Sequence, residues 1–165
     1  MSTLSSLALL RPGVQRGRAS SYDPTGGNRD WWEIEPGERR TIAALTGPGC
    51  IKHIWCTLWC ESEFAFRKAV LRAWWDGETE PSIETPLGDF FGLGHGLSRN
   101  FVSLPLQMSP QDGRGFNCWF PMPYQSAARL EIENQSDQRL NFYFYVDYET
   151  YPGDTQLDGY GRFHA

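Results

Sequence analysis

The sequence lacks basic stretches and long apolar runs. Its 165 residues hold 15 Lys and Arg against 20 Asp and Glu, giving a formal net charge of −5. Without a basic stripe, nucleic acid is not expected as a partner. No apolar run approaches the roughly 20 residues of a membrane-spanning helix, and the short run at 3–10 has no positive charge before it, unlike a secretory signal. We therefore expect a cytoplasmic protein with no membrane partner.

Cysteine and histidine are too sparse to form an obvious metal centre. The four cysteines contain no CxxC pair, and His53 and Cys56 have no second pair of ligands close to them in the sequence. Because zinc sites usually join two such pairs, we expect neither a metal nor a cofactor. The thiols are interpreted as reduced and mostly buried. They belong to Cys50, Cys56, Cys60 and Cys118.

Motifs for nucleotide binding and for nucleophilic catalysis are also missing. The glycine-rich stretch 84–96, ETPLGDFFGLGHG, has Leu97 where a dinucleotide fingerprint needs glycine, and no helical pattern follows it. The sequence contains neither GK[ST] nor GxSxG. A metal at Asp89 and His95 is one alternative for this stretch. The other is that its glycines form positive-φ turns and that Asp89 caps backbone amides.

Aromatic residues, by contrast, are abundant: seven Trp, seven Tyr and ten Phe. Such rings fill β cores, and they also stack on the faces of sugars. In the stretch 21–32, SYDPTGGNRDWW, polar groups lie beside the ring faces of Trp31 and Trp32. The polar groups belong to Asn28, Arg29 and Asp30. This combination is typical of sugar binding. The alternative is that Trp31 fills the core and that Arg29 pairs with Asp30 at the surface.

Apolar residues alternate with a period of two along most of the chain. In 50–60, Ile54 and Cys56 fall on one face, whereas His53 and Trp55 fall on the other, which is typical of a β-strand. Similar segments are separated by turn residues, and helical patterns are almost absent. We predict an all-β fold, a single antiparallel jelly-roll sandwich of about eight strands. The predicted strands are 38–46, 50–60, 67–76, 82–87, 100–108, 116–122, 127–134 and 139–149.

The domain organisation is predicted to have three parts. Residues 1–37 form a short N-terminal helix at 3–10, stopped by Pro12, and a glycine-rich loop at 11–30. Residues 38–149 form the jelly roll. Residues 150–165 are a tail with few apolar residues, which we interpret as a connection cut before its next element.

Five ordered stretches carry a resemblance to a known family. They are SYDPTGGNRDWW, LTGPGCIKHIWCT, ETPLGDFFGLGHG, FNCWFPMPY and FYFYVDYE. From about residue 4 to its end, the chain resembles the DUF2961 family, now grouped with glycoside hydrolase family 172. The resemblance implies two consecutive jelly-roll domains that assemble into trimers or larger rings. It also implies a retaining action on furanosides, α-D-fructofuranosides and D-arabinofuranosides among them, with one Glu as nucleophile and another as acid/base.

This sequence departs from that family in length. Family members are more than twice as long, and the GTEDY-like segment and the catalytic Glu pair lie in the second jelly roll. The resemblance therefore implies an N-terminal half that is inactive alone and holds no catalytic residue.

The resemblance also assigns substrate-binding residues and partners. The substrate-binding residues are Asp30, Trp31, Asp89, Phe90 and Phe91, and the expected partners are a furanoside-containing carbohydrate and further copies of the chain. Two alternatives stay open. The chain is a stand-alone carbohydrate-binding module, or it is a structural jelly roll that assembles.

Overall fold

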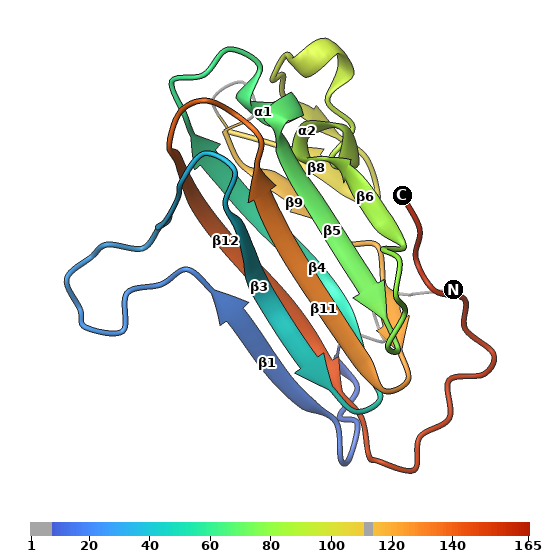
Figure 1. Cartoon of the computed structure of the whole chain (residues 1–165). Helices are drawn as coiled ribbons and strands as arrows, with labels where there is room; N and C mark the ends of the chain where they lie inside the picture. Colours follow the sequence, from blue (N-terminus) through green and yellow to red (C-terminus); the bar gives the residue numbers. More distant parts are fainter. Residues whose placement is uncertain (1–7, 111–113) are drawn as a thin grey trace.

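The protein is a sandwich of two antiparallel β-sheets in the computed structural model, which describes residues 8–110 and 114–165 (Figure 1). The strands are β1 (Gln15–Ser20), β2 (Trp32–Ile34), β3 (Arg39–Thr46), β4 (Gly49–Trp59), β5 (Ala69–Trp75), β6 (Ile83–Pro86), β7 (Phe101–Val102), β8 (Leu106–Met108), β9 (Phe116–Cys118), β10 (Met122–Tyr124), β11 (Ala127–Asn134) and β12 (Leu140–Thr150). Short helices α1 (Ala65–Lys68) and α2 (Leu87–Phe90) and the 3-10 turn η2 (Gly94–Gly96) lie beside them. The prediction of an all-β antiparallel sandwich is confirmed.

Each sheet has a simple strand order. Sheet A runs β1-β12-β4-β9-β8-β7, with β2 also paired to β12 and β10 also paired to β4. Sheet B runs β3-β11-β5-β6 and lies in front of sheet A in Figure 1. Every pairing between the described strands is antiparallel, and each sheet covers one face of the other.

The two longest strands, β4 and β12, form the centre of sheet A. Their register places Phe144 opposite Cys56 and Val146 opposite Ile54, and all four side chains are buried. The period-two pattern read from the sequence explains this, because every second residue of each strand then faces sheet B. Burial of each large apolar side chain stabilises the fold by about 1.5–3 kcal/mol.

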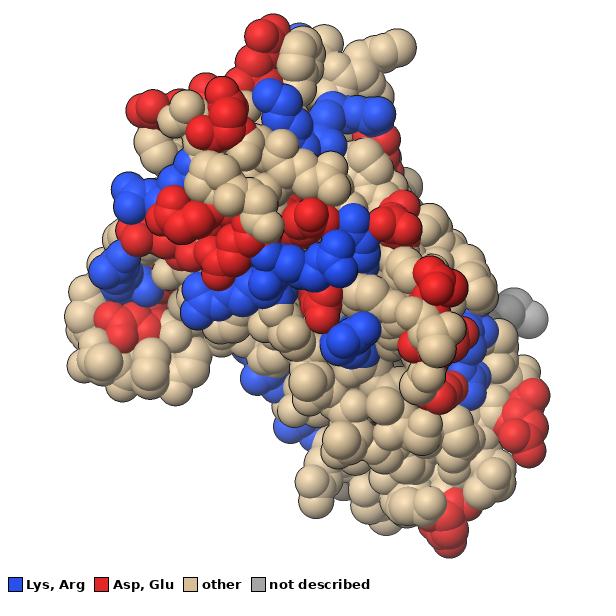
Figure 2. Space-filling model, viewed as in Figure 1, with Lys and Arg blue, Asp and Glu red and all other residues tan. Residues whose placement is uncertain are grey.

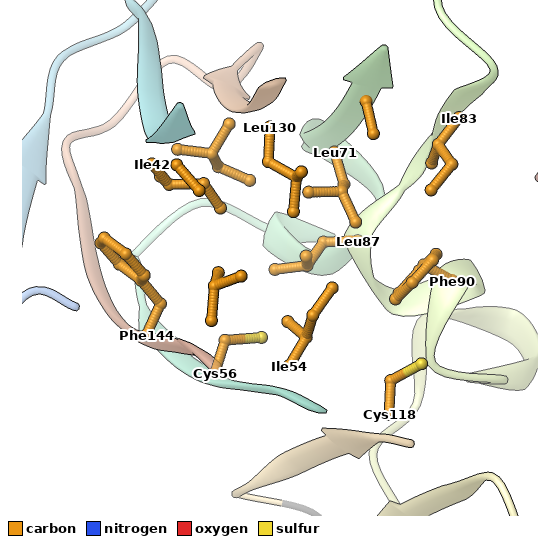
Figure 3. Packing of buried hydrophobic residues seen from close by; sticks show 14 of the residues in the cluster. Ile42, Ile54, Cys56, Leu71, Ile83, Leu87, Phe90, Cys118, Leu130 and Phe144 are labelled. Carbon is orange, nitrogen blue, oxygen red and sulfur yellow. The ribbon is translucent and has the colours of Figure 1, made fainter. Parts of the chain in front are cut away.

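The core fills the space between the two sheets. Figure 3 shows Ile42, Leu71 and Leu130 of sheet B facing Ile54 and Phe144 of sheet A. These side chains are at most 4 % exposed. The aliphatic and aromatic side chains therefore share one continuous core, which holds the two sheets together.

Ion pairs between neighbouring strands cover the outer face of sheet B. Arg72, only 9 % exposed in its side chain, binds both Glu133 and Glu84, and Arg39 lies 3.4 Å from Glu133. Figure 2, viewed as in Figure 1, shows a band of blue and red across the molecule. Arg129 covers the ring of Trp74 at 4.0 Å. The charged groups on this face are therefore largely paired with one another within the chain.

The predicted loop at 11–30 is wrong over 15–20, where β1 pairs with β12 along six residue pairs. The sequence pattern of 15–20 does not indicate a strand, because β1 is an edge strand whose outward residues Arg16 and Arg18 are charged. Ala19 packs against the core, and Gly17 lies under the ring of Tyr148, where a Cβ atom would clash. Ion pairs with β12, rather than apolar alternation, identify this strand.

Two predicted strands are divided in the structure. The predicted strand 100–108 is divided into β7 and β8. The predicted strand 116–122 is divided into β9, which ends at Cys118, and β10, which begins at Met122. With β1 and β2 added, twelve strands lie in the described residues instead of the predicted eight or so. Pro105 and Pro121 interrupt the two segments, and proline cannot donate a ladder hydrogen bond.

The C-terminal tail runs along the edge strand β6. The Ala165 amide donates to the Ser82 carbonyl at 3.1 Å, and the Glu84 amide donates to the Ala165 carbonyl at 2.9 Å. The Trp75 indole donates to the Phe163 carbonyl at 2.7 Å. Residues 163–165 therefore extend the hydrogen bonding of sheet B at its edge (Figure 1).

The predicted helix at 3–10 falls mostly on residues 1–7, which lie outside the described residues. In the part of the chain that the structure does describe, no helix has the length and apolarity needed to cross a bilayer.

Candidate functional site

Aromatic side chains gather on the outer face of sheet A. Trp55 of β4 stacks on Tyr145 of β12 with 4.9 Å between ring centroids. The ring of Trp31, just before β2, lies 5.8 Å from that of Tyr143 in a tilted arrangement. We call this surface the aromatic face; its rings belong to Trp31, His53, Trp55, Trp119, Tyr143 and Tyr145. Most of these side chains are half-buried, and Trp119 is 41 % exposed.

The alternation of residues along β12 places its tyrosine rings on the outer face of sheet A. In β12, Phe142, Phe144 and Val146 face the core, so Tyr143 and Tyr145 must face outward. The tyrosine hydroxyl also favours the outer side, where water reaches it.

A row of polar side chains crosses the aromatic face from strand to strand. Arg18 of β1 binds Asp147 of β12 with two hydrogen bonds of 2.5 and 3.0 Å. His53 of β4 lies between Asp147 and Asn117 of β9, with Nδ1 3.1 Å from Asp147 and Nε2 3.1 Å from Asn117. The ring of Trp119 stacks on His53 at 5.2 Å. Four strands thus hold one continuous polar row.

Asp147 is the charged centre of this row. Burial opposes ionisation, but hydrogen bonds from Arg18 and His53 hold the pKa of Asp147 below its usual range. A carboxylate that stays ionised orients both neighbours, since it fixes the Arg18 fork and one nitrogen of the His53 ring. The Arg18 guanidinium also lies 4.3 Å from the Tyr145 ring centroid.

Replacing Asp147 with asparagine is expected to destabilise the fold by about 1 kcal/mol at neutral pH, because charged hydrogen bonds to Arg18 and His53 are lost. The folded-state pKa of Asp147 lies below its unfolded value, so its contribution is present above about pH 3.9 and is lost as the pH falls through the folded pKa. Urea unfolding of both proteins from pH 7 to pH 2 measures this. A difference that persists unchanged at pH 2 would contradict the assignment.

The predicted pair Asp30 and Trp31 lies at one end of the aromatic face. The Asp30 carboxylate accepts a 2.8 Å hydrogen bond from the Asp23 amide, so it organises the loop before β2. Trp31 contacts Tyr143, and the Arg29 guanidinium lies 5.6 Å from its ring centroid. Among the described residues, the buried indole nitrogen of Trp31 has no hydrogen-bond partner.

The alternative reading of this loop is corrected in two respects. Arg29 pairs with Glu33 at 2.7 Å instead of Asp30. The tryptophan that packs against the core is Trp32, edge-on to Phe144, while Trp31 stays half-exposed outside the core cluster. The i,i+4 spacing of Arg29 and Glu33 was the signal available in the sequence.

The other predicted residues lie elsewhere. Phe90 and Phe91 are 8 % and 1 % exposed, and their rings pack in the core with 5.0 Å between centroids. Asp89, on α2, forms an ion pair with Arg67. Figure 1 places α2 well apart from the loop 21–31. The structure therefore does not bring Asp89, Phe90 and Phe91 together with Asp30 and Trp31, and a substrate role for them stays a prediction.

The glycine-rich stretch serves as a turn beside α2. Gly92 and Gly96 have φ values of 81° and 69°, in the left-handed region that favours glycine. His95, between them, is exposed. Within residues 8–110 and 114–165, no three His, Cys, Asp or Glu side chains converge as a metal site requires.

The sequence did not predict the polar row that crosses the aromatic face. The alternation in 50–60 placed His53 and Trp55 on one face of the strand, without showing which face is the outer one. It did not show that β4 and β12 are neighbours, and Arg18 was hidden in a segment taken for a loop. Register and pairing, not residue pattern, bring the polar row together.

One family model, described as the GH172 first beta-sandwich domain, matches residues 12–162. The chain belongs to this family. The match includes all twelve strands and both sheets, so the whole sandwich corresponds to the first domain of GH172. A comparison with curated proteins finds no match.

Proposed function

We propose that this GH172 sandwich is the N-terminal half of a glycoside hydrolase that acts on furanosides, α-D-fructofuranosides or D-arabinofuranosides. The observation that carries the proposal is the match to the GH172 first beta-sandwich domain over residues 12–162. The aromatic face supports it, because stacked rings beside fixed hydrogen-bonding groups suit the C–H faces and hydroxyls of a sugar.

The catalytic Glu pair of this proposal lies outside the chain. A retaining glycosidase needs a general acid with a raised pKa, roughly 5–5.5 Å from a nucleophilic carboxylate. Asp147 and Glu149 share one face of β12, but arginines pair with both, and both pKa values are lowered. Each described carboxylate with a clearly shifted pKa has it lowered; these are Asp23, Asp76, Glu133, Asp137, Asp147 and Glu149.

Assays on p-nitrophenyl α-D-fructofuranoside and α-D-arabinofuranoside test this directly. The isolated chain is expected to release no nitrophenol above the blank, whereas a full-length GH172 relative releases it. Circular dichroism of the isolated chain serves as the folding control. Furanoside hydrolysis by the folded chain alone would overturn the claim that the catalytic pair lies elsewhere.

A second candidate is a stand-alone carbohydrate-binding module. It is favoured by Trp59 and Trp119, which are 55 % and 41 % exposed. Titration with furanose oligosaccharides, followed at the tryptophan indole signals by NMR, distinguishes it. Shifts at Trp119 but not at Trp74, on the opposite sheet, would support this function. No shift at millimolar sugar would exclude it.

The proposed assembly into trimers or larger oligomers has its own support. Leu97, Val102 and Leu104 are 58 %, 76 % and 95 % exposed around the short edge strand β7. Exposed apolar groups close to a sheet edge favour association. Light scattering measures the oligomeric state, and a strictly monomeric chain would contradict this proposal.

A further inference from the structure

A groove lies at the end of sheet A where β4 begins and β12 ends. Its volume is about 930 Å³, and the tail after β12 forms one wall. The residues that matter for its chemistry are Arg11, Lys52, Tyr151, Thr155, Gln156 and Tyr160. We call it the tail groove. It lies outside the stacked rings of the aromatic face.

A β-bulge directs Lys52 into the tail groove. His53 of β4 pairs with Asp147, but the next pair joins Ile51 to Tyr148, so Lys52 is an extra residue without a partner in β12. Bulges re-aim side chains and commonly lie beside functional sites. Lys52 lines the tail groove and also an adjoining hollow formed with Arg16, Asp147 and Glu149.

Positive charge exceeds negative charge around the bulge. Four cations, Arg11, Arg16, Arg18 and Lys52, surround two carboxylates. Glu149, whose side chain is 6 % exposed, binds Arg11 and lies 3.7 Å from Arg16, and Asp147 is held by Arg18. The protein as a whole carries a charge of −5. This local excess therefore attracts an anion.

Lys52 is the cation still available to a ligand. Within the described residues, its ammonium makes no hydrogen bond or ion pair, although its charge contributes to lowering the pKa of Glu149. The sequence holds only one other lysine, Lys68, which donates to Ser62 Oγ at 3.0 Å. An exposed ammonium on a rigid strand, beside paired arginines, is suited to a carboxylate or phosphate.

Other residues that line the groove suit a polyhydroxylated ring. Tyr160 is 63 % exposed and offers a ring face. Thr155 supplies a hydroxyl, and Gln156 supplies an amide whose nitrogen donates to the Asp154 carbonyl at 3.3 Å. Tyr151 donates to Glu149 Oε2 at 3.4 Å, so its ring is held in place.

We propose that the tail groove binds an acidic sugar, with the Lys52 ammonium on its carboxylate or phosphate and the Tyr160 ring against its C–H face. This proposal does not depend on furanoside hydrolysis. The ring recognises the sugar, and the charge excess recognises the acid. A free inorganic anion would interact with the charge excess but not with the Tyr160 ring.

Reductive ¹³C-methylation gives a direct test on the full chain, because Lys52 and Lys68 are the only lysines and each keeps its charge. Methyl β-D-glucuronide and glucose 6-phosphate are expected to shift the Lys52 signal but not the Lys68 signal. Neutral methyl β-D-glucoside is expected to bind about tenfold more weakly. The affinity of the acidic sugars should fall as salt rises from 0.05 to about 0.3 M.

Two matched variants complete the experiment. Lys52→Gln is expected to weaken glucuronide binding about tenfold, while Lys68→Gln leaves it unchanged. Tyr160→Ser should weaken the binding of the acidic sugars without changing the shift of the Lys52 signal on addition of inorganic phosphate. Equal binding of glucuronide and glucoside, no shift at Lys52, or phosphate binding as tight as glucose 6-phosphate would each overturn the proposal.

Discussion

Gly49→Ala is expected to destabilise the protein by about 3 kcal/mol or more, the upper end for an overpacked core position. Gly49 lies opposite Tyr124 of β10 and opposite Thr150 of β12, between two hydrogen-bonded neighbours. A Cβ atom there would lie 2.6 Å from the Glu149 carbonyl and would also overlap the Tyr124 side chain. Tyr124 is fully buried and cannot turn away.

The cost is high because one of the atoms that the added Cβ would meet, the Glu149 carbonyl oxygen, belongs to the backbone. A flexible side chain can move by a few tenths of an ångström, but the Glu149 carbonyl belongs to the central strand β12. Relief requires separation of β4 from β12, the two longest strands of the sandwich. The melting temperature is expected to fall by roughly 6–12 °C for a chain of this size.

Thermal and urea unfolding of the purified variant measure the effect. Gly94→Ala is the matched control, because a Cβ atom at Gly94 meets nothing within 4 Å. Its stability should change by less than about 0.5 kcal/mol. Equal stability of the Gly49 and Gly94 variants would show that β4 and β12 do not pack as described.

Arg72→Ala is expected to cost about 3 kcal/mol, because it breaks a largely buried ion pair and leaves Glu133 without its main partner. Arg72 bridges β11 and β6 by binding Glu133 and Glu84 from the strand between them. The Glu133 side chain is only 17 % exposed. Arg39, whose guanidinium lies 3.4 Å from the Glu133 carboxylate, compensates in part for the lost Arg72 charge.

The two ion pairs of Arg72 are expected to contribute differently to the free energy of unfolding. Glu84 is 55 % exposed, so Glu84→Gln should cost less than about 1 kcal/mol, as is usual for solvated pairs. If Glu84→Gln destabilised the protein as much as Arg72→Ala, burial would not be what makes the bridge strong.

The Arg72 effect should also depend on pH. Burial opposes ionisation of Glu133, but hydrogen bonding from Arg72 keeps its folded pKa below the usual value. A lowered folded pKa stabilises the protein above about pH 4.3, the unfolded value, and this contribution disappears as the pH falls through the folded pKa. Urea unfolding of the wild type and Arg72→Ala should therefore give converging stabilities on acidification. A constant difference down to pH 2 would exclude the ion pair as the cause.

The sequence predicted best where burial and pattern coincide. In β4, β11 and β12, buried apolar residues recur with a period of about two, so the sequence predicted all three as strands. In β1 the inward residues are only Gly17 and Ala19, and no apolar signal exists. The short strands β9 and β10 flank Pro121, and a single hydrophobic segment concealed the break.

Sites were harder to predict than strands. The resemblance assigned Phe90 and Phe91 to the substrate site, whereas in the structure packing against Phe163 and Phe116 buries both rings. Composition cannot distinguish a ring that fills a core from a ring that faces solvent. Only the path of the chain around the sandwich makes that distinction.

The sequence by itself determined the all-β class, the long strands and, through five ordered motifs, the resemblance to GH172. These properties are local or cumulative along the chain, so neighbouring residues suffice to encode them. Only the tertiary structure decided that Arg18, Asp147, His53 and Asn117 form one row, and that Lys52 stands on a bulge beside a groove. Those residues are separated by up to 129 positions, and the pairing register between strands brings them together.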